Sequence, residues 1–220
     1  MNLHQPNIII EGDSHYTIGT LRGNEVFYDF DKMLIYLQAK GKLLFGKDFR
    51  IFEEDHQMLF KLCNYFIKDV KNCRKFDMDI NKGLLLSGPV GCGKTSLMKL
   101  MRHLVPHYRP YEVIPARNIT FGFNNVGFKI IEAYGDKKFY CFDDLGVEPT
   151  GKYFGKDCNV IGEILLSRYD LFLNHKILTH ATTNLNAEEL EDRYGNRVRS
   201  RMRELFNLVA FDTKAEDKRT

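Results

Sequence analysis

The sequence lacks long apolar segments and closely spaced pairs of cysteines. Its first 17 residues, MNLHQPNIIIEGDSHYT, contain no basic leader and no apolar run longer than three residues. We therefore expect neither a signal peptide nor a membrane span. The five cysteines are odd in number and form no C-x-x-C pair, which is typical of reduced thiols in a cytoplasmic protein. The seven histidines show no metal-binding spacing.

Internal repeats, low-complexity tracts and a strong net charge are also absent from the sequence. The 220 residues are 44% hydrophobic and 28% charged, which is ordinary for a globular protein with a sizeable core. The net charge of +3 permits a nucleic-acid partner without indicating one. Basic residues do gather near the C-terminus, and on charge alone this cluster indicates a solvated helix face. Its members are Arg193, Arg197, Arg199, Arg201, Arg203, Lys214, Lys218 and Arg219.

One segment carries a specific signal, GLLLSGPVGCGKTSLMKL, which runs from Gly83 to Leu100. It fits the pattern G-x-x-x-x-G-K-[ST], with an apolar stretch before it and leucines and methionines at helical spacing after it. A glycine-rich turn before an ordinary helix is the alternative, but the order of strand, loop and helix favours a phosphate-binding loop. The predicted nucleotide-binding residues are Gly88, Pro89, Val90, Gly91, Cys92, Gly93, Lys94, Thr95 and Ser96.

The residue types in this loop suit phosphate binding. Glycines let the backbone curl so that successive N–H groups point at phosphate oxygens, and the N-terminus of the next helix favours negative charge. We expect Lys94 to reach the β- and γ-phosphates and the Thr95 hydroxyl to ligate Mg²⁺. A nucleotide with Mg²⁺ is therefore the predicted ligand.

Two carboxylates follow a second apolar stretch, in FYCFDD from Phe139 to Asp144. An apolar strand that ends in acids is the Walker B pattern, in which Asp143 would hold the metal ion and Asp144 would position the attacking water. Aspartates are common in turns after strands, so this pattern gains its weight from the phosphate loop that precedes it.

Polar side chains also end the next predicted strand, in the segment THATTNLN. Thr182, Thr183 and Asn184 would lie at the carboxyl edge of the sheet, where ligands of open α/β sheets gather. The alternative is that Asn184 or Asn186 caps the helix that begins with AEEL. Asn186 is the better cap, and Asn184 is the better candidate for contact with a phosphate.

The segment RYGNRVRSRMRELF places Arg197 and Arg201 four residues apart, hence on one face of a helix. An arginine on a fixed helix could reach the γ-phosphate bound by a neighbouring subunit, although surface arginines commonly have no such role.

Strands and helices alternate along the second part of the chain, which predicts an α/β fold with a parallel five-stranded sheet and helices on both faces. The chain is expected to divide into an N-terminal extension, residues 1–52, and a P-loop domain, residues 53–220. The predicted strands are residues 83–87, 111–114, 138–144, 176–183 and 208–211, and the predicted helices are residues 31–38, 53–71, 95–104, 126–134 and 160–173.

Together these segments resemble the AAA+ ATPases of the DnaC/DnaI helicase-loader and IstB transposition-ATPase group. The resemblance covers about residues 81–211. It rests on GPVGCGKT as Walker A, FYCFDDLG as Walker B, TTN as sensor 1 and YGNRVRSRMRE as the arginine-bearing box. The segments DDLG and GNRVRSRM, in that order, are the most particular to this group.

The resemblance implies an ATP-hydrolysing protein that forms a homo-oligomer on ATP binding, grips DNA, and hands a helicase or transposase onto it. Single-stranded DNA is the favoured form. The arginine finger would be Arg201 first and Arg197 second. Because the chain ends soon after the last predicted strand, we expect the helical lid of the AAA+ fold to be truncated or absent. Residues 1–52 differ from the helicase-binding domain of bacterial loaders and are a candidate partner-binding segment.

Two other functions stay open at this stage. A nucleotide-gated adaptor with little hydrolysis would suit Asp144, because many ATPases of this type carry the longer glutamate there. A P-loop small-molecule kinase is less favoured, because such kinases usually lack the TTN strand end. For DNA contacts, the candidate residues are Lys129, Lys137 and Lys138.

Overall fold

A computed structural model of the chain describes residues 5–105, 110–212, 215 and 217–218. The chain divides into two compact units, the first made of Met1–Met78 with Lys99–Pro110 and the second of Asp79–Met98 with Tyr111–Thr220. The functional boundary expected between residues 52 and 53 stays a prediction. Within the described part of the chain, no helix is both long and apolar enough to cross a membrane.

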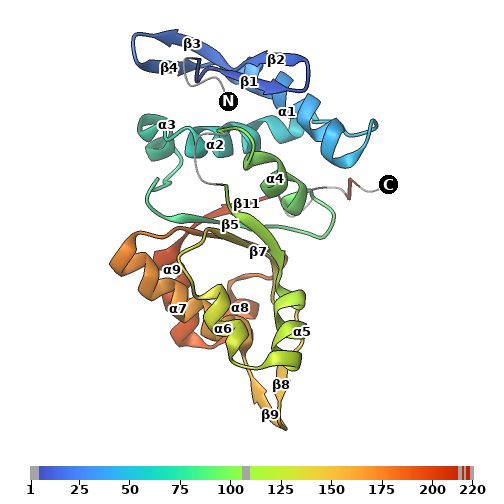
Figure 1. The fold of residues 1–220 in the computed structure, drawn as a ribbon, viewed down its shortest axis with the longest axis vertical. Helices are drawn as coiled ribbons and strands as arrows, with labels where there is room; N and C mark the ends of the chain where they lie inside the picture. Colours follow the sequence, from blue (N-terminus) through green and yellow to red (C-terminus); the bar gives the residue numbers. More distant parts are fainter. Residues whose placement is uncertain (1–4, 106–109, 213–214, 216, 219–220) are drawn as a thin grey trace. The chain divides into compact units, whose positions relative to one another are not determined.

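The second unit is built on a five-stranded sheet in the order β11-β5-β10-β7-β6, in which all neighbouring strands are parallel (Figure 1). Its strands are β5 (Gly83–Ser87), β6 (Glu112–Pro115), β7 (Tyr140–Leu145), β10 (Thr179–Thr183) and β11 (Phe206–Ala210). All five were predicted from their apolar runs, and β5 has the predicted bounds. The predicted α/β fold class is confirmed.

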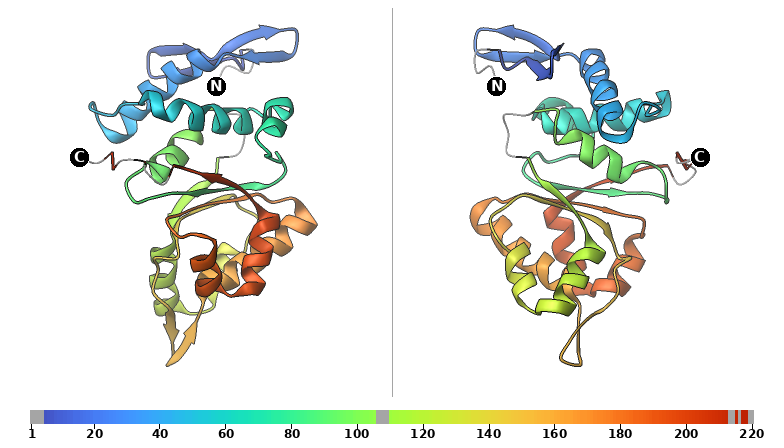
Figure 2. Two further views of the ribbon diagram at one scale, coloured as in Figure 1. Left: turned by 180° about the vertical axis from the view of Figure 1, so that it is seen from behind. Right: turned by 45° about the vertical axis from the view of Figure 1, so that its right-hand side comes forward.

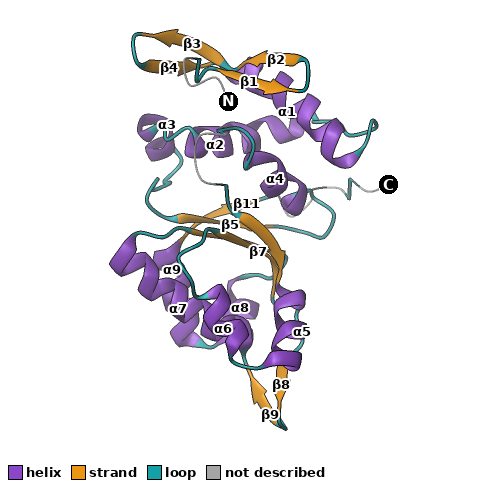
Figure 3. Cartoon of the chain, in the orientation of Figure 1, coloured by secondary structure: helices purple, strands orange, loops and turns teal. Residues whose placement is uncertain are grey.

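Five helices gather on one side of this sheet, and α4 (Lys94–Met101) leaves the phosphate loop on the other side (Figures 1, 2 and 3). The five are α5 (Ala116–Val126), α6 (Lys129–Tyr134), α7 (Val160–His175), α8 (Ala187–Tyr194) and α9 (Asn196–Leu205). Their apolar faces and the sheet share one core, which includes Phe123, Phe142, Ile164 and Met202. Each such buried side chain stabilises the unit by about 1.5–3 kcal/mol relative to an exposed one.

A buried arginine fastens α7 to the sheet. Arg168 is fully buried, and its guanidinium donates to the carbonyl oxygens of Lys138 at 2.9 Å and Leu178 at 3.3 Å. Its Nε donates to Thr179 Oγ1 at 2.8 Å. Burial lowers the pKa of Arg168 to about 10, so the side chain remains a cation at neutral pH. It therefore holds the helix against the segments that lead into β7 and β10.

One predicted helix of the second unit begins later in the structure than expected. The helix expected over residues 126–134 begins only at Lys129, as α6, because α5 ends at Val126, where Gly127 adopts a φ of 68° and its N–H donates to the Phe123 carbonyl oxygen. Most of α5 was not predicted, since its sequence ARNITFGFNNV is rich in weak helix formers. The hairpin of β8 (Gly151–Tyr153) and β9 (Lys156–Cys158) was not predicted either.

The first unit contains two antiparallel hairpins and a set of helices. The hairpins pair β1 (Ile8–Glu11) with β2 (Ser14–Thr17) and β3 (Gly19–Arg22) with β4 (Glu25–Tyr28). The helices are α1 (Phe30–Phe45), a 3-10 turn η1 (Glu53–Asp55), α2 (His56–Phe66) and α3 (Val70–Lys75).

The helix predicted over residues 53–71 ends early, at Phe66. Lys68 adopts a φ of 58°, which a helix interior does not allow. The side chain of Asp69 then accepts from the Asn72 N–H at 2.9 Å and begins α3. The helix predicted over residues 31–38 is instead longer than expected, since α1 continues to Phe45.

Candidate nucleotide-binding site

The predicted phosphate loop joins β5 to α4 and encloses the amino group of its lysine. Gly91 and Gly93 have φ values of 86° and 95°, a left-handed conformation that glycine adopts without steric cost. Lys94 is buried, and its Nζ donates to the carbonyl oxygens of Gly88 and Pro89, both at 2.8 Å. The curled backbone thus holds one positive charge at the start of α4.

The loop threonine and the first Walker B aspartate lie side by side. Thr95 Oγ1 is 2.9 Å from Asp143 Oδ1 and 3.0 Å from Oδ2. Thr182 on β10 donates its hydroxyl to Asp143 Oδ1 at 2.6 Å. These residues meet because β10 lies between β5 and β7 and the three strands are parallel, so their carboxyl ends share one edge.

This group of side chains fits the predicted metal ion. Hydroxyl and carboxylate oxygens are the protein ligands that Mg²⁺ prefers, and the ion usually takes its other ligands from waters and phosphates. Among the described residues, no cluster of three or more His, Cys, Asp or Glu side chains could hold a metal by itself. Thr95 and Asp143 could therefore hold Mg²⁺ together with a bound nucleotide.

Asp144 differs from its neighbour in both conformation and environment. Its side chain is exposed at the carboxyl edge of the sheet, and its φ is 57°. Its N–H donates to Thr182 Oγ1 at 2.9 Å, so one threonine fixes both aspartates. A left-handed conformation outside glycine is uncommon and clusters at functional sites. Sequence reasoning placed Thr182 at this edge but gave it no specific contact.

The two asparagines after β10 have separate roles. Asn186 is the N-cap of α8, because its Oδ1 accepts from the N–H groups of Glu188 at 2.9 Å and Glu189 at 3.0 Å. The predicted cap is confirmed. Oδ1 of Asn184 is buried and has no hydrogen-bond partner among the described residues. This free polar atom at the sheet edge is compatible with the predicted sensor role, which stays a prediction.

The two candidate finger arginines lie on α9 as expected. The guanidinium carbon of Arg201 is 5.3 Å from the centre of the Tyr169 ring, and its NH1 donates to the Arg197 carbonyl oxygen at 3.1 Å. The side chain of Arg197 is exposed. Which of them acts on a neighbouring subunit stays a prediction.

The C-terminal segment contacts the phosphate loop, which no sequence pattern indicated. The Phe211 N–H donates to the Ser87 carbonyl oxygen at 2.8 Å, and the Lys218 N–H donates to the Gly91 carbonyl oxygen at 3.2 Å. A methyl group built on Gly91 would lie 2.2 Å from an oxygen of the Asp217 carboxylate. A negative charge therefore lies beside the loop.

Comparison with known proteins shows which solved structures share the fold of this chain. The sequence matches no protein-family model and no curated protein. Among solved structures, that of the DnaC helicase loader superposes with a TM-score of 0.53 and 15% identity, over 76% of this chain and 94% of that one. AMPPCP-bound DnaA from Aquifex aeolicus superposes with a TM-score of 0.50 and 17% identity, over 76% of this chain and 49% of that one.

A second DnaA structure, the replication initiator bound to AMPPCP and single-stranded DNA, gives a TM-score of 0.50 and 18% identity, over 77% of this chain and 50% of that one. Identities this low establish a common fold only. The chain therefore has the α/β fold of the DnaC helicase loader and the DnaA initiator, which confirms the fold that the sequence resemblance implied.

Proposed function

We propose that the chain is a Mg²⁺-dependent ATPase that acts on DNA, as a loader of a helicase or an accessory of a transposase. One observation carries the proposal. The Thr95 hydroxyl of the phosphate loop lies within 3.0 Å of both carboxylate oxygens of Asp143, at the start of the helix that begins with buried Lys94. The likeness to DnaA structures that hold AMPPCP supports ATP as the nucleotide.

The described side chains divide the work of hydrolysis. Lys94 and the loop N–H groups would bind the β- and γ-phosphates, while Thr95 and Asp143 would hold Mg²⁺, which neutralises phosphate charge when bound. Asp144 would orient the attacking water, and Asn184 would contact the γ-phosphate. An arginine of α9 from a neighbouring copy would stabilise the transferred charge, an effect worth about 10³–10⁵ in rate.

The hairpin β8–β9 supplies a surface suited to single-stranded DNA. Phe154 at its tip is 88% exposed, and exposed Lys152 and Lys156 flank it. Tyr153 anchors the hairpin, since its ring centre is 6.0 Å from that of Phe123 on α5. Exposed aromatic rings stack on bases at about 1–3 kcal/mol each, and lysines follow the phosphate backbone. An exposed phenylalanine between two lysines has this chemistry.

The three lysines predicted to contact DNA lie at two places. Lys129 is exposed at the start of α6, directly after Phe128, whose ring centre is 6.4 Å from that of Tyr153 in the hairpin. Lys137 and Lys138 are exposed in the segment that precedes β7, at the opposite end of that strand from the aspartates. Lys129 is therefore the strongest of the three candidates.

Phosphate release with and without single-stranded DNA tests the proposal. A loader hydrolyses ATP faster on DNA, a small-molecule kinase is indifferent to DNA, and an adaptor releases almost no phosphate in either case. We expect Phe154→Ala to keep the basal rate and to lose most of the stimulation by DNA. The matched control is Leu208→Ala, which shortens an exposed apolar side chain on β11. Stimulation that survives Phe154→Ala would remove the hairpin from the DNA surface.

A further inference from the structure

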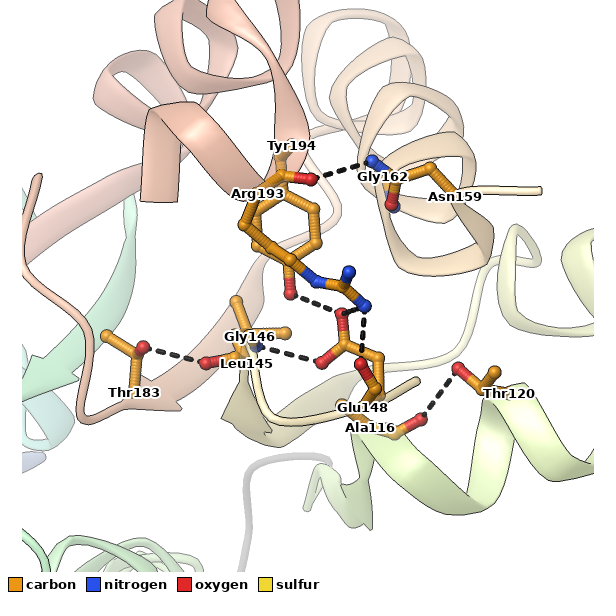
Figure 4. A network of polar contacts seen from close by, with 10 residues as sticks. All are labelled: Ala116, Thr120, Leu145, Gly146, Glu148, Asn159, Gly162, Thr183, Arg193 and Tyr194. Carbon is orange, nitrogen blue, oxygen red and sulfur yellow. Dashed lines mark hydrogen bonds and ion pairs between the residues drawn. The ribbon is translucent and has the colours of Figure 1, made fainter. Parts of the chain in front are cut away.

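A buried glutamate follows the Walker B aspartates. Glu148 is 4% exposed. Its Oε2 accepts from the Gly146 N–H at 2.8 Å, and its Oε1 accepts from the Tyr194 hydroxyl at 2.8 Å (Figure 4). Burial and the Glu148 carboxylate raise the pKa of Tyr194 well above its ordinary value, so this hydroxyl remains a donor. The turn after Asp144 is thereby joined to the last residue of α8.

Arg193 joins the same two segments. Its guanidinium donates to the carbonyl oxygen of Glu148 and lies 3.4 Å from Oε1 of the carboxylate. Its own carbonyl oxygen accepts from Asn159 Nδ2 at 3.1 Å, and Asn159 caps α7 through the Gly162 N–H at 3.1 Å. Figure 4 shows Arg193 between Glu148 and Asn159, with a contact to each. The end of α8 is thus fixed to both the Walker B turn and the start of α7.

The other side of the turn is fixed to β10. The Thr183 hydroxyl donates to the Leu145 carbonyl oxygen at 2.8 Å (Figure 4). Gly146 has a φ of 97°, and a methyl group built on it would lie 2.1 Å from the side chain of Leu185. The turn is therefore held on both sides, by Thr183 of β10 and by Glu148 with its partners on α8.

The position of this network matters because the arginine helix begins immediately after it. Only Gly195 separates Tyr194 from α9, which starts at Asn196 and carries Arg197 and Arg201. Buried ion pairs are weak contributors to stability, since desolvation offsets much of their attraction, but they fix geometry where the partners must stay in one register. Here the contacts of Glu148 fix the position of α9, which carries the arginines, relative to the Walker B turn.

We propose that Glu148 is a positioning residue that sets α9 relative to the Walker B turn, so that the arginine of one subunit is aligned for the nucleotide of its neighbour. This inference rests on the proposed ATP hydrolysis at sites shared between subunits. In this arrangement, the Walker B turn lies beside the nucleotide of its own subunit. The same turn positions the arginine that acts on the nucleotide of the neighbouring subunit.

The variant Glu148→Gln tests the inference, because it keeps the size of the side chain but removes its charge and replaces one acceptor with a donor. We expect ATP affinity to change less than about twofold. Turnover should fall about 10²-fold, as misplacement of a reacting group by roughly 1 Å costs that much.

Mixtures of variants separate a misplaced arginine from a damaged nucleotide site. Glu148→Gln mixed with Lys94→Ala should regain turnover, since the second protein lends a well-placed arginine to the intact loop of the first. Glu148→Gln mixed with the double variant Arg197→Ala/Arg201→Ala should stay inactive. The reverse pattern, rescue only by the double variant, would overturn the inference by placing the defect in the subunit's own site.

Controls distinguish this role from a loss of folding. Asp192→Asn removes an exposed carboxylate next to Arg193 and should match the unaltered protein. Should Glu148→Gln fail to fold, Tyr194→Phe removes one donor to Glu148 and should give the same pattern of rescue with a smaller loss of turnover. Normal turnover in both variants would overturn the inference, whereas an unaltered protein without any turnover would overturn the proposed function itself.

Discussion

Two adjacent aspartates have opposite environments at the end of β7. Asp143 is buried between two threonine hydroxyls, whereas Asp144 is exposed in a left-handed conformation. A residue held by hydroxyls at a strand end is suited to a metal ion, and an exposed neighbour is suited to water. The sequence could predict that both acids lie at this strand end, because the apolar strand, the two acids and the phosphate loop are each local patterns; their separate roles stay predictions.

These environments predict different effects of substitution. Asp143→Ala removes a metal ligand, so it should abolish the Mg²⁺ dependence of ATP affinity. Asp144→Asn keeps the side-chain size and should leave ATP bound while slowing hydrolysis at least about tenfold, in the range of lost general-base or water-positioning groups. Equilibrium binding with and without Mg²⁺, together with phosphate release, measures both. Normal hydrolysis by both variants would show that β7 does not carry the Walker B function.

Among the elements, those with a long apolar run were predictable and those held by tertiary contacts were not. All five strands of the sheet could be read from their residues. The hairpin β8–β9 has short, mostly polar strands, and α5 is rich in weak helix formers, so neither had a local signal. The role of Glu148 depends on partners about 46 positions away, and a single sequence does not reveal such a pairing.

The pairing of β10 with β5 predicts a stability change with pH. His180 is buried and its Nδ1 accepts from the Leu84 N–H at 3.1 Å. Burial lowers the pKa of His180 to about 3, from an ordinary value of 6.5. The unfolded chain therefore binds more protons between these values, and stability falls as pH drops below about 6.5. From this residue alone we expect a loss of about 2 kcal/mol between pH 7 and pH 5.

The variant His180→Asn isolates this contribution, because asparagine can accept the same N–H without titrating. Its free energy of unfolding, measured with urea at pH 7 and pH 5, should change less than that of the unaltered protein. Equal losses in the two proteins would mean that His180 is protonated in the folded state.

The C-terminal segment predicts a change in nucleotide affinity. The Asp217 carboxylate lies beside Gly91 of the phosphate loop, where its charge opposes that of a bound triphosphate. Asp217→Asn should therefore bind ATP severalfold more tightly, with the largest effect at low salt. Asp192→Asn, which removes an exposed acid on α8, is the control for net charge. Weaker binding by Asp217→Asn would show that the segment assists the nucleotide.

At the scale of the whole molecule, the small net charge of the chain limits its affinity for DNA. A net charge of +3 gives one copy only a weak field, so on the proposed function we expect tight binding only when several copies align their hairpin lysines along one strand. We expect affinity for single-stranded DNA, measured by fluorescence anisotropy, to require a slowly hydrolysed ATP analogue and to fall steeply with salt as counterions are released. Equal, salt-insensitive binding with and without the analogue would favour the adaptor over the loader.

The nucleotide site is the claim on which the other proposals depend, and one calorimetric measurement tests it most directly. ATP with Mg²⁺ is titrated into the unaltered protein, into Lys94→Ala, and into Lys99→Ala, which removes an exposed lysine from the same helix. We predict binding to the first and third proteins with similar affinity, and binding to Lys94→Ala at least about tenfold weaker, since a charge-assisted contact to phosphate is lost. Equal ATP affinity in all three proteins, or no binding to the unaltered one, would contradict the phosphate-loop assignment.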